Sequence, residues 1–145
     1  YLDYGAFTPI QVAAATALTG KSDCINQIRN VYKNRRDTLI ESMDRIGRNI
    51  PSPPATMFAW APLPEKFKKI GSMAFSKILL KEASVAVAPG IGFGEYGEGF
   101  VRLGLVENEH RIRQASRNLK QVIMNADKLI AEYEEVTRSN DRTDR

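Results

Sequence analysis

The chain has 145 residues, of which 43% are apolar, with 21 basic and 17 acidic side chains and a formal charge of +4. This composition predicts one soluble globular domain with a core of its own. No apolar run approaches the roughly 18 residues that a membrane helix needs. The basic residues are interspersed with acidic ones and form no basic block with interleaved aromatic residues, so we expect no nucleic-acid partner and no membrane. The single Cys24 excludes an internal disulfide and fits a reducing compartment.

The chain begins with Tyr1 instead of methionine, and an apolar run follows closely. This start predicts a piece of a longer protein. A first helix is expected over 10–18, with Thr8 as its N-cap and Pro9 in its first turn. Gly20 is expected to end this helix, because glycine readily adopts the backbone conformation found after a helix.

A longer helix is expected from Ser22 or Asp23 to about Ile46. Its apolar residues recur at spacings of three, four and seven, which places them on one stripe that can be buried. The basic cluster at 33–36 lies in the middle of this helix and is expected to be solvated. The stripe consists of Ile25, Ile28, Tyr32, Leu39, Met43 and Ile46.

Three segments, 56–61, 85–88 and 100–106, have strand-like composition and are bounded by glycine and proline. Between the first two, Ser72 is expected to cap a helix that extends to about Ala83. Together with the flanking helices, these segments predict an α+β fold. Its core is a small, mainly antiparallel sheet of about three strands that is covered by helices.

After the third strand, Asn108 is expected to cap one final long helix that extends to about Tyr133. No apolar residue follows Val136, so the residues after it have no means of burying a face. Residues 137–145 are therefore expected to form a disordered tail.

The glycine-rich stretch 92–97 matches the GxGxxG pattern of dinucleotide-binding proteins. That pattern requires a helix to begin at its third glycine, so that the first backbone N–H groups of the helix face the pyrophosphate. Here the third glycine, Gly97, is followed by another predicted strand. The sequence therefore predicts no dinucleotide site.

Arg102 lies in the middle of the third predicted strand and shares a strand face with Gly104, which leaves room in front of it. One interpretation is a partly exposed cation that pairs with Glu95, Glu98 or Glu107. The other is a planar guanidinium that binds a carboxylate or a phosphate with two hydrogen bonds. No metal site is expected, because the chain has a single histidine, and no set of residues typical of hydrolysis is present.

Four segments of the sequence resemble one known family. They are 1–11 (YLDYGAFTPIQ), 55–62 (ATMFAWAP), 89–94 (PGIGFG) and 101–108 (VRLGLVEN). Together they resemble the C-terminal part of class I/II aminotransferases of fold type I, which depend on pyridoxal phosphate. Within this family the chain is most similar to bacterial alanine (glutamate–pyruvate) aminotransferases, whose relatives include aspartate and LL-diaminopimelate aminotransferases.

The resemblance implies that Arg102 binds the α-carboxylate of amino-acid and keto-acid substrates. It also implies a cytoplasmic homodimer, with Asp3 or Tyr4 facing the site of the neighbouring subunit. The family's Schiff-base lysine, the aspartate that pairs with the pyridine nitrogen and the phosphate-binding loop all lie upstream of Tyr1. No catalytic residue is therefore expected in this chain, and its cofactor-binding residues are unknown.

The resemblance further implies how the chain divides. Residues 1–20 would end a large domain, 21–47 would form a helix between domains, and 48–136 would form a small C-terminal domain before the tail at 137–145. The parent enzyme is expected to transfer an amino group between L-alanine and 2-oxoglutarate, and the chain alone is expected to be inactive. The alternatives are a fragment of an aspartate or LL-diaminopimelate aminotransferase, or a free-standing α+β binding module.

Overall fold

A computed structural model describes residues 5–143 of the chain. The positions expected to face a neighbouring subunit, Asp3 and Tyr4, lie outside the described residues. The chain divides into two compact units, Tyr1–Val31 and Tyr32–Arg145, which are described separately. None of the helices in the described range is both long and apolar enough to span a bilayer.

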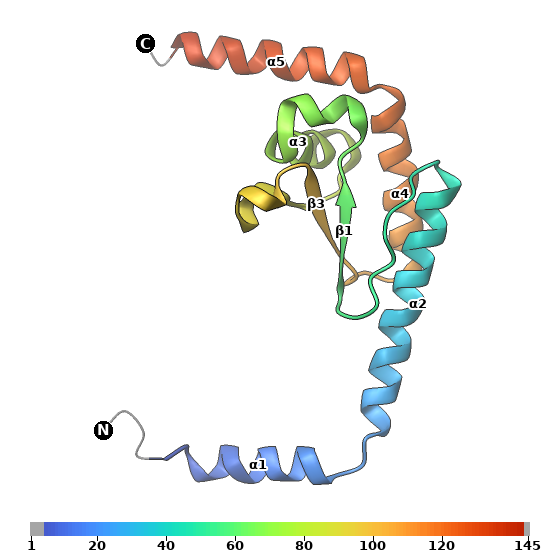
Figure 1. The fold of residues 1–145 in the computed structure, drawn as a ribbon, viewed down its shortest axis with the longest axis vertical. Helices are drawn as coiled ribbons and strands as arrows, with labels where there is room; N and C mark the ends of the chain where they lie inside the picture. The colour runs from blue at the N-terminus through green and yellow to red at the C-terminus, as the bar shows by residue number, and fades with distance from the viewer. Residues whose placement is uncertain (1–4, 144–145) are drawn as a thin grey trace. The chain divides into compact units, whose positions relative to one another are not determined.

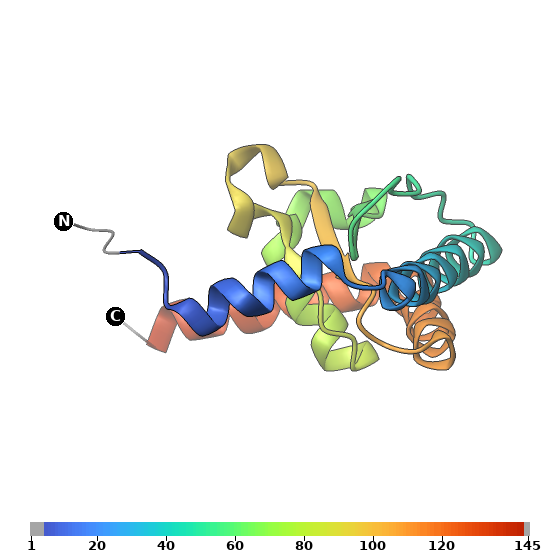
Figure 2. The ribbon, with the colours of Figure 1, turned by 90° about the horizontal axis from the view of Figure 1, so that it is seen from below.

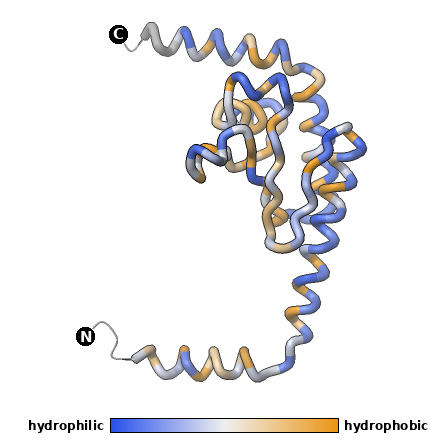
Figure 3. The backbone as a smooth tube through the Cα atoms, viewed as in Figure 1, coloured by the Kyte–Doolittle hydropathy of each residue, from blue (hydrophilic) through white to orange (hydrophobic). Residues whose placement is uncertain are grey.

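The first unit contains α1 (Thr8–Thr19) and the beginning of α2 (Asp23–Arg45). Helix α1 is confirmed, but Thr8 is its first residue and not its N-cap, since no side chain caps the helix. The helix ends before Gly20, as predicted, but Gly20 has an extended backbone (φ −77°, ψ −177°) and not the left-handed one typical after a helix; its N–H donates to the Thr16 carbonyl. Figure 3 shows apolar residues along α1, and none of the helix is buried within the unit.

The part of α2 that belongs to the second unit buries Leu39 and Met43. The basic cluster at 33–36 is not simply solvated, as the sequence suggested. The Arg35 guanidinium donates to the carbonyls of Leu105 (3.0 Å) and Val106 (3.2 Å), which follow the third strand. Arg35 thus satisfies two backbone carbonyls that lie just beyond the end of the third strand and have left the sheet's hydrogen-bond pattern. These bonds connect α2 to the end of that strand.

The sheet has the order β1-β3-β2, with both pairs antiparallel (Figure 1). It consists of β1 (Phe58–Pro62), β2 (Ala88–Pro89) and β3 (Phe100–Gly104), which confirms the predicted α+β fold with three strands. Strand β2 is shorter than expected, because the Val85 N–H donates to the Leu79 carbonyl and closes the preceding helix. The chain therefore reaches the sheet only at Ala88.

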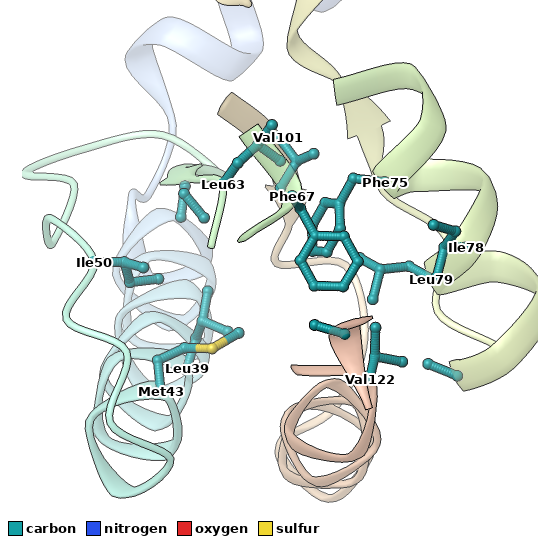
Figure 4. Close-up of a cluster of buried hydrophobic side chains, with 14 of the residues drawn as sticks. Leu39, Met43, Ile50, Leu63, Phe67, Phe75, Ile78, Leu79, Val101 and Val122 are labelled. Atoms are coloured by element: carbon teal, nitrogen blue, oxygen red, sulfur yellow. The ribbon is translucent and has the colours of Figure 1, made fainter. Parts of the chain in front are cut away.

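One face of the sheet carries the core. The inward residues of β1 and β3 pack against η1 (Glu65–Ile70) and α3 (Gly71–Ala83). Figure 4 shows the rings of Phe67 and Phe75 at the centre of this core, and their centroids are 4.8 Å apart. The buried residues of the two strands are Ala59, Ala61 and Val101.

The final helix is divided in two, α4 (Glu109–Met124) and α5 (Ala126–Thr143), whereas the sequence predicted one. The Asn108 side chain caps α4, as predicted, by accepting from the Arg111 N–H at 3.0 Å. The break falls at Asn125, whose side chain donates to the Gln121 carbonyl and so competes with the helical backbone.

The expected disordered tail at 137–145 is not found over its described part, because α5 continues to Thr143. Two contacts along the helix support the first turn of this extension. The Arg138 guanidinium lies 3.8 Å from the Glu134 carboxylate, and the Thr137 hydroxyl donates to the Tyr133 carbonyl. An ion pair four residues apart, such as Arg138 with Glu134, stabilises a helix without apolar burial.

The glycine-rich segment between β2 and β3 forms two short 3-10 turns, η2 (Gly90–Phe93) and η3 (Glu95–Gly97). The chain then returns directly into β3, so no helix begins at Gly97 and the GxGxxG match is not a dinucleotide site. Figures 1 and 2 show this segment extending beyond the ends of the strands. Its two ends touch: a Cβ placed on Gly90 would lie 1.8 Å from the Gly97 carbonyl oxygen.

Candidate functional site

Arg102 lies at the centre of the sheet. It belongs to the middle strand, β3, and is paired with Trp60 of β1 on one side and with Ala88 of β2 on the other. Ala88 has a small side chain, and Gly104, two residues farther along the same strand face, has none. The side chain of Arg102 is half-buried and borders a cavity of about 670 Å³.

Two aromatic rings contact the guanidinium of Arg102. Its Cζ atom lies 4.1 Å from the ring centroid of Phe58 and 4.3 Å from that of Phe93. Phe58 pairs with Gly104, so its ring can lean along the strand toward the arginine. Phe93 comes from η2 and packs edge-to-face on Trp60, with centroids 5.3 Å apart.

The structure agrees with the interpretation of Arg102 as a partly exposed cation but does not show the ion pair expected with it. Among residues 5–139, Arg102 has no acidic partner within salt-bridge distance. Of the three expected partners, Glu98 is held elsewhere, because its carboxylate accepts from the Ser72 N–H (2.7 Å) and the Ser72 hydroxyl (2.9 Å). The hydrogen-bonding edges of the Arg102 guanidinium therefore have no protein partner in the described part of the chain.

The Glu98 carboxylate fastens the glycine-rich segment to the start of α3. Ser72 was expected to cap this helix, but it is the second helical residue, and Glu98 takes that role from 26 residues away. The Ser72 hydroxyl also accepts from the Ile91 N–H at 3.1 Å, so both ends of the segment are tied to one residue. These bonds fix the loop from which Phe93 reaches Arg102.

The Gly99 N–H also donates to the Glu98 carboxylate at 2.9 Å, and together with the bonds from Ser72 it lowers the pKa of the Glu98 carboxyl. The largest cause is the Gly99 N–H, burial acts in the opposite direction, and the N–H and hydroxyl of Ser72 add to the lowering. Since the folded-state pKa lies below the unfolded value, this group stabilises the fold above the unfolded pKa. The stabilisation is lost as the pH falls through the folded-state pKa.

We expect Glu98→Gln to lower the free energy of unfolding of the chain at pH 7 by about 1 kcal/mol, a value common for helix N-caps, because the exposed carboxylate is screened. The deficit should shrink as the pH falls below 4.5, the ordinary value of a glutamate carboxyl, because the stabilisation by the carboxylate is lost as the pH falls through the lower folded-state pKa of Glu98. Urea unfolding followed by Trp60 fluorescence at pH 7 and pH 3.5 measures the deficit in unfolding free energy and its decrease at low pH. Glu95→Gln, in the same loop, is the control. An equal deficit at both pH values would contradict the assignment.

The charged groups at this site are suited to binding an anionic ligand. No group of three His, Cys, Asp or Glu residues able to hold a metal ion occurs in the described part. The charged residues that line the cavity are Arg102, Glu107 and Arg111, and no lysine lines it. The site thus offers a planar cation with free N–H edges, which is suited to a carboxylate.

Sequence reasoning identified Arg102 as a candidate but missed the two phenylalanines and the bonds of Ser72 to Glu98. The alternation of Phe58 and Trp60 on one strand face was a usable signal, because β1 and β3 are neighbours in the sheet. For Phe93 the only signal was its position between two glycines. The cation–ring contacts depend on strand register and on the path of the loop, which the sequence does not display.

The fold and the site together define a small α+β domain that presents, at the centre of a sheet, an arginine left unpaired by the described side chains. The sequence profile of the family described as "Aminotransferase class I and II" matches residues 4–119. The chain belongs to this aminotransferase family, as its resemblance to the family predicted.

Individual relatives agree with this assignment. The chain is 62% identical over 127 residues to a putative aminotransferase, AatC, of Rhizobium meliloti (strain 1021), covering 88% of the chain and 31% of that relative. It is 50% identical over 120 residues to the glutamate-pyruvate aminotransferase AlaC of Escherichia coli (strain K12), covering 83% of the chain and 29% of that relative. The chain thus spans about a third of the length of these curated relatives.

A solved structure supports the fold. The apo structure of BacF from Bacillus subtilis aligns with a TM-score of 0.73 and 30% sequence identity, covering 81% of this chain and 30% of that one. The aminotransferase family in general depends on pyridoxal phosphate. The residues around Arg102 do not by themselves suit this cofactor, since the cavity beside Arg102 has no lysine to bind it covalently.

Proposed function

We propose that this chain is the C-terminal, substrate-binding part of an aminotransferase that exchanges an amino group between L-alanine and 2-oxoglutarate. Arg102 would bind the α-carboxylate of each substrate. The observation that carries the proposal is the position of Arg102: it is central in the sheet, half-buried, and without an acidic partner among residues 5–139. A fixed guanidinium with free edges can hold a planar carboxylate in one orientation.

In this proposal, Arg102 binds the substrate, and the cofactor performs the amino-group chemistry. Arg102 would hold the carboxylate end of the substrate, whereas pyridoxal phosphate, bound by residues outside this chain, would carry the amino group. We further propose that residues 1–20 end a large domain, that 21–47 connect the domains and that 48–136 form the small domain. The complete protein would be a cytoplasmic homodimer.

The choice of L-alanine rests on similarity. The relative named as a glutamate-pyruvate aminotransferase is 50% identical to this chain, whereas the relatives named as LL-diaminopimelate aminotransferases that are compared here are 36–39% identical. The side-chain pocket of the substrate would be shared with residues outside the chain. Specificity therefore has to be measured on the complete protein.

In the complete protein, supplied with pyridoxal phosphate and 2-oxoglutarate, we expect L-alanine to be the preferred amino donor. Its kcat/KM should exceed those of L-aspartate and LL-diaminopimelate by about tenfold or more, because a pocket fitted to a methyl group excludes larger, charged side chains. Pyruvate formation and 2-oxoglutarate consumption measure the rates. The 145-residue chain alone, supplied with the same cofactor, is the control and should show no turnover.

Two results would contradict this proposal. A higher kcat/KM for L-aspartate or LL-diaminopimelate would assign the parent enzyme to one of the alternative specificities. Steady turnover by the 145-residue chain alone would show that the residues for cofactor binding lie within it.

A further inference from the structure

We propose that Phe58 and Phe93 are positioning residues that hold the Arg102 guanidinium with its N–H edges open, so that the site selects planar carboxylates over tetrahedral anions. We call this pair the aromatic clamp. The inference rests on the proposed function, in which Arg102 binds the substrate carboxylate.

The contacts of the aromatic clamp restrict how the guanidinium is oriented. The Arg102 Cζ atom lies 4.1 Å from one ring centroid and 4.3 Å from the other, which is within the range of cation–π attraction. The rings come from different elements, β1 and η2, so a rotation of the arginine away from them would break both contacts. A guanidinium packed on ring faces keeps its edge free for two parallel hydrogen bonds with a coplanar ligand.

Each ring is held in place by contacts of its own. Phe58 is fixed by the pairing of β1 with β3, opposite Gly104. Phe93 packs edge-to-face on Trp60 at 5.3 Å, and its loop is tied to Ser72 through the bonds of Ile91 and Glu98. The clamp is therefore formed before a ligand arrives, and the arginine loses little conformational freedom when it binds one.

The aromatic clamp also determines the shape of anion that fits. A carboxylate can place both of its oxygens in the guanidinium plane, so it can bind at the free N–H edge without displacing either ring. The three oxygens of a sulfonate cannot all lie in one plane with the guanidinium, so at least one must point toward a ring face, whose negative charge repels it. The clamp should therefore favour carboxylate over sulfonate for ligands with the same alkyl group.

The test uses Phe93→Leu and Phe58→Leu in the complete protein with its cofactor. For each variant, KM for L-alanine should rise about tenfold while kcat stays within about twofold, because the clamp acts on carboxylate binding. Binding of propanoate and ethanesulfonate, which carry the same ethyl group, is measured by calorimetry and as competitive inhibition. Wild type should prefer propanoate about tenfold, and each leucine variant should lose most of this preference.

Two further variants separate a positioning role from a structural one. Phe93→Tyr keeps the ring and should restore both KM and the anion preference to near wild type. Tyr96→Leu removes a fully exposed ring from the same loop and should change neither. Unfolding midpoints of all variants report on folding; Phe93 is 49% exposed, so its leucine variant should remain folded.

The inference is overturned if both leucine variants keep the wild-type KM and anion preference, if Phe93→Tyr behaves like Phe93→Leu, or if Tyr96→Leu is equally damaging. Arg102→Ala distinguishes this failure from failure of the proposed function. If Arg102→Ala abolishes propanoate binding while both leucine variants retain it, only the clamp is wrong. If Arg102→Ala binds propanoate normally, the proposed function itself is wrong.

Discussion

Replacing Arg102 by alanine in the complete protein is expected to reduce kcat/KM for amino-acid substrates about 100- to 1,000-fold. This corresponds to about 3–4 kcal/mol, the usual effect of removing one partner from a desolvated, hydrogen-bonded charge pair. The loss should be large because the guanidinium that Phe58 and Phe93 contact would make both hydrogen bonds to the carboxylate. Among the described residues, no other cation contacts these two rings. Steady-state kinetics with L-alanine and 2-oxoglutarate measures it.

Two matched variants give this experiment its controls. Arg102→Lys keeps the charge but not the planar fork, so its kcat/KM should lie between those of wild type and Arg102→Ala. Arg117→Ala removes an exposed arginine from α4 and should leave the kinetics unchanged. A value of kcat/KM within about threefold of wild type for Arg102→Ala would contradict the assigned role.

Replacing Gly90 by alanine is expected to destabilise the second unit by about 3–5 kcal/mol. The new Cβ would lie 1.8 Å from the Gly97 carbonyl oxygen and 2.5 Å from that of Phe100. Both obstacles are backbone atoms, so no side-chain rotation can relieve the overlap. Urea unfolding of the 145-residue chain, followed by the fluorescence of its single tryptophan, Trp60, measures the change.

The control for this substitution is Gly92→Ala in the same turn. A Cβ on Gly92 meets nothing within 4 Å, and the backbone there is not in the left-handed region. Its alanine variant should therefore unfold within about 0.5 kcal/mol of wild type. Equal destabilisation by the Gly90 and Gly92 substitutions would contradict this explanation. It would show that position 90 requires glycine for loop flexibility and not for the close approach of the two ends of the loop.

The sequence was sufficient for features that depend on local pattern. The strand around Arg102 was predictable because its apolar residues alternate, and the cap at Asn108 was predictable because its side chain acts within one helical turn. The α+β class followed from the order of such segments. The break at Asn125 was missed, since apolar residues continue at helical spacing on both sides of it.

Features that depend on contacts distant in sequence were not predictable. Ser72 has the sequence signature of a cap, but its role is determined by Glu98, 26 residues away. The clamp likewise depends on the register that places Phe58 opposite Gly104 and on the path that brings Phe93 back to the sheet. The sequence could identify Arg102 as a candidate, but only the positions of its neighbours show that the described residues leave it unpaired.

The open edges of the small sheet have a consequence for self-association. Strands β1 and β2 are its outer strands, and exposed strand edges can recruit strands from other molecules. Strand β2 has only two residues, one of them Pro89, which has no N–H to donate, and β1 ends at Pro62. Both edges are therefore poor templates for strand addition, and the sheet should resist growth into fibrils.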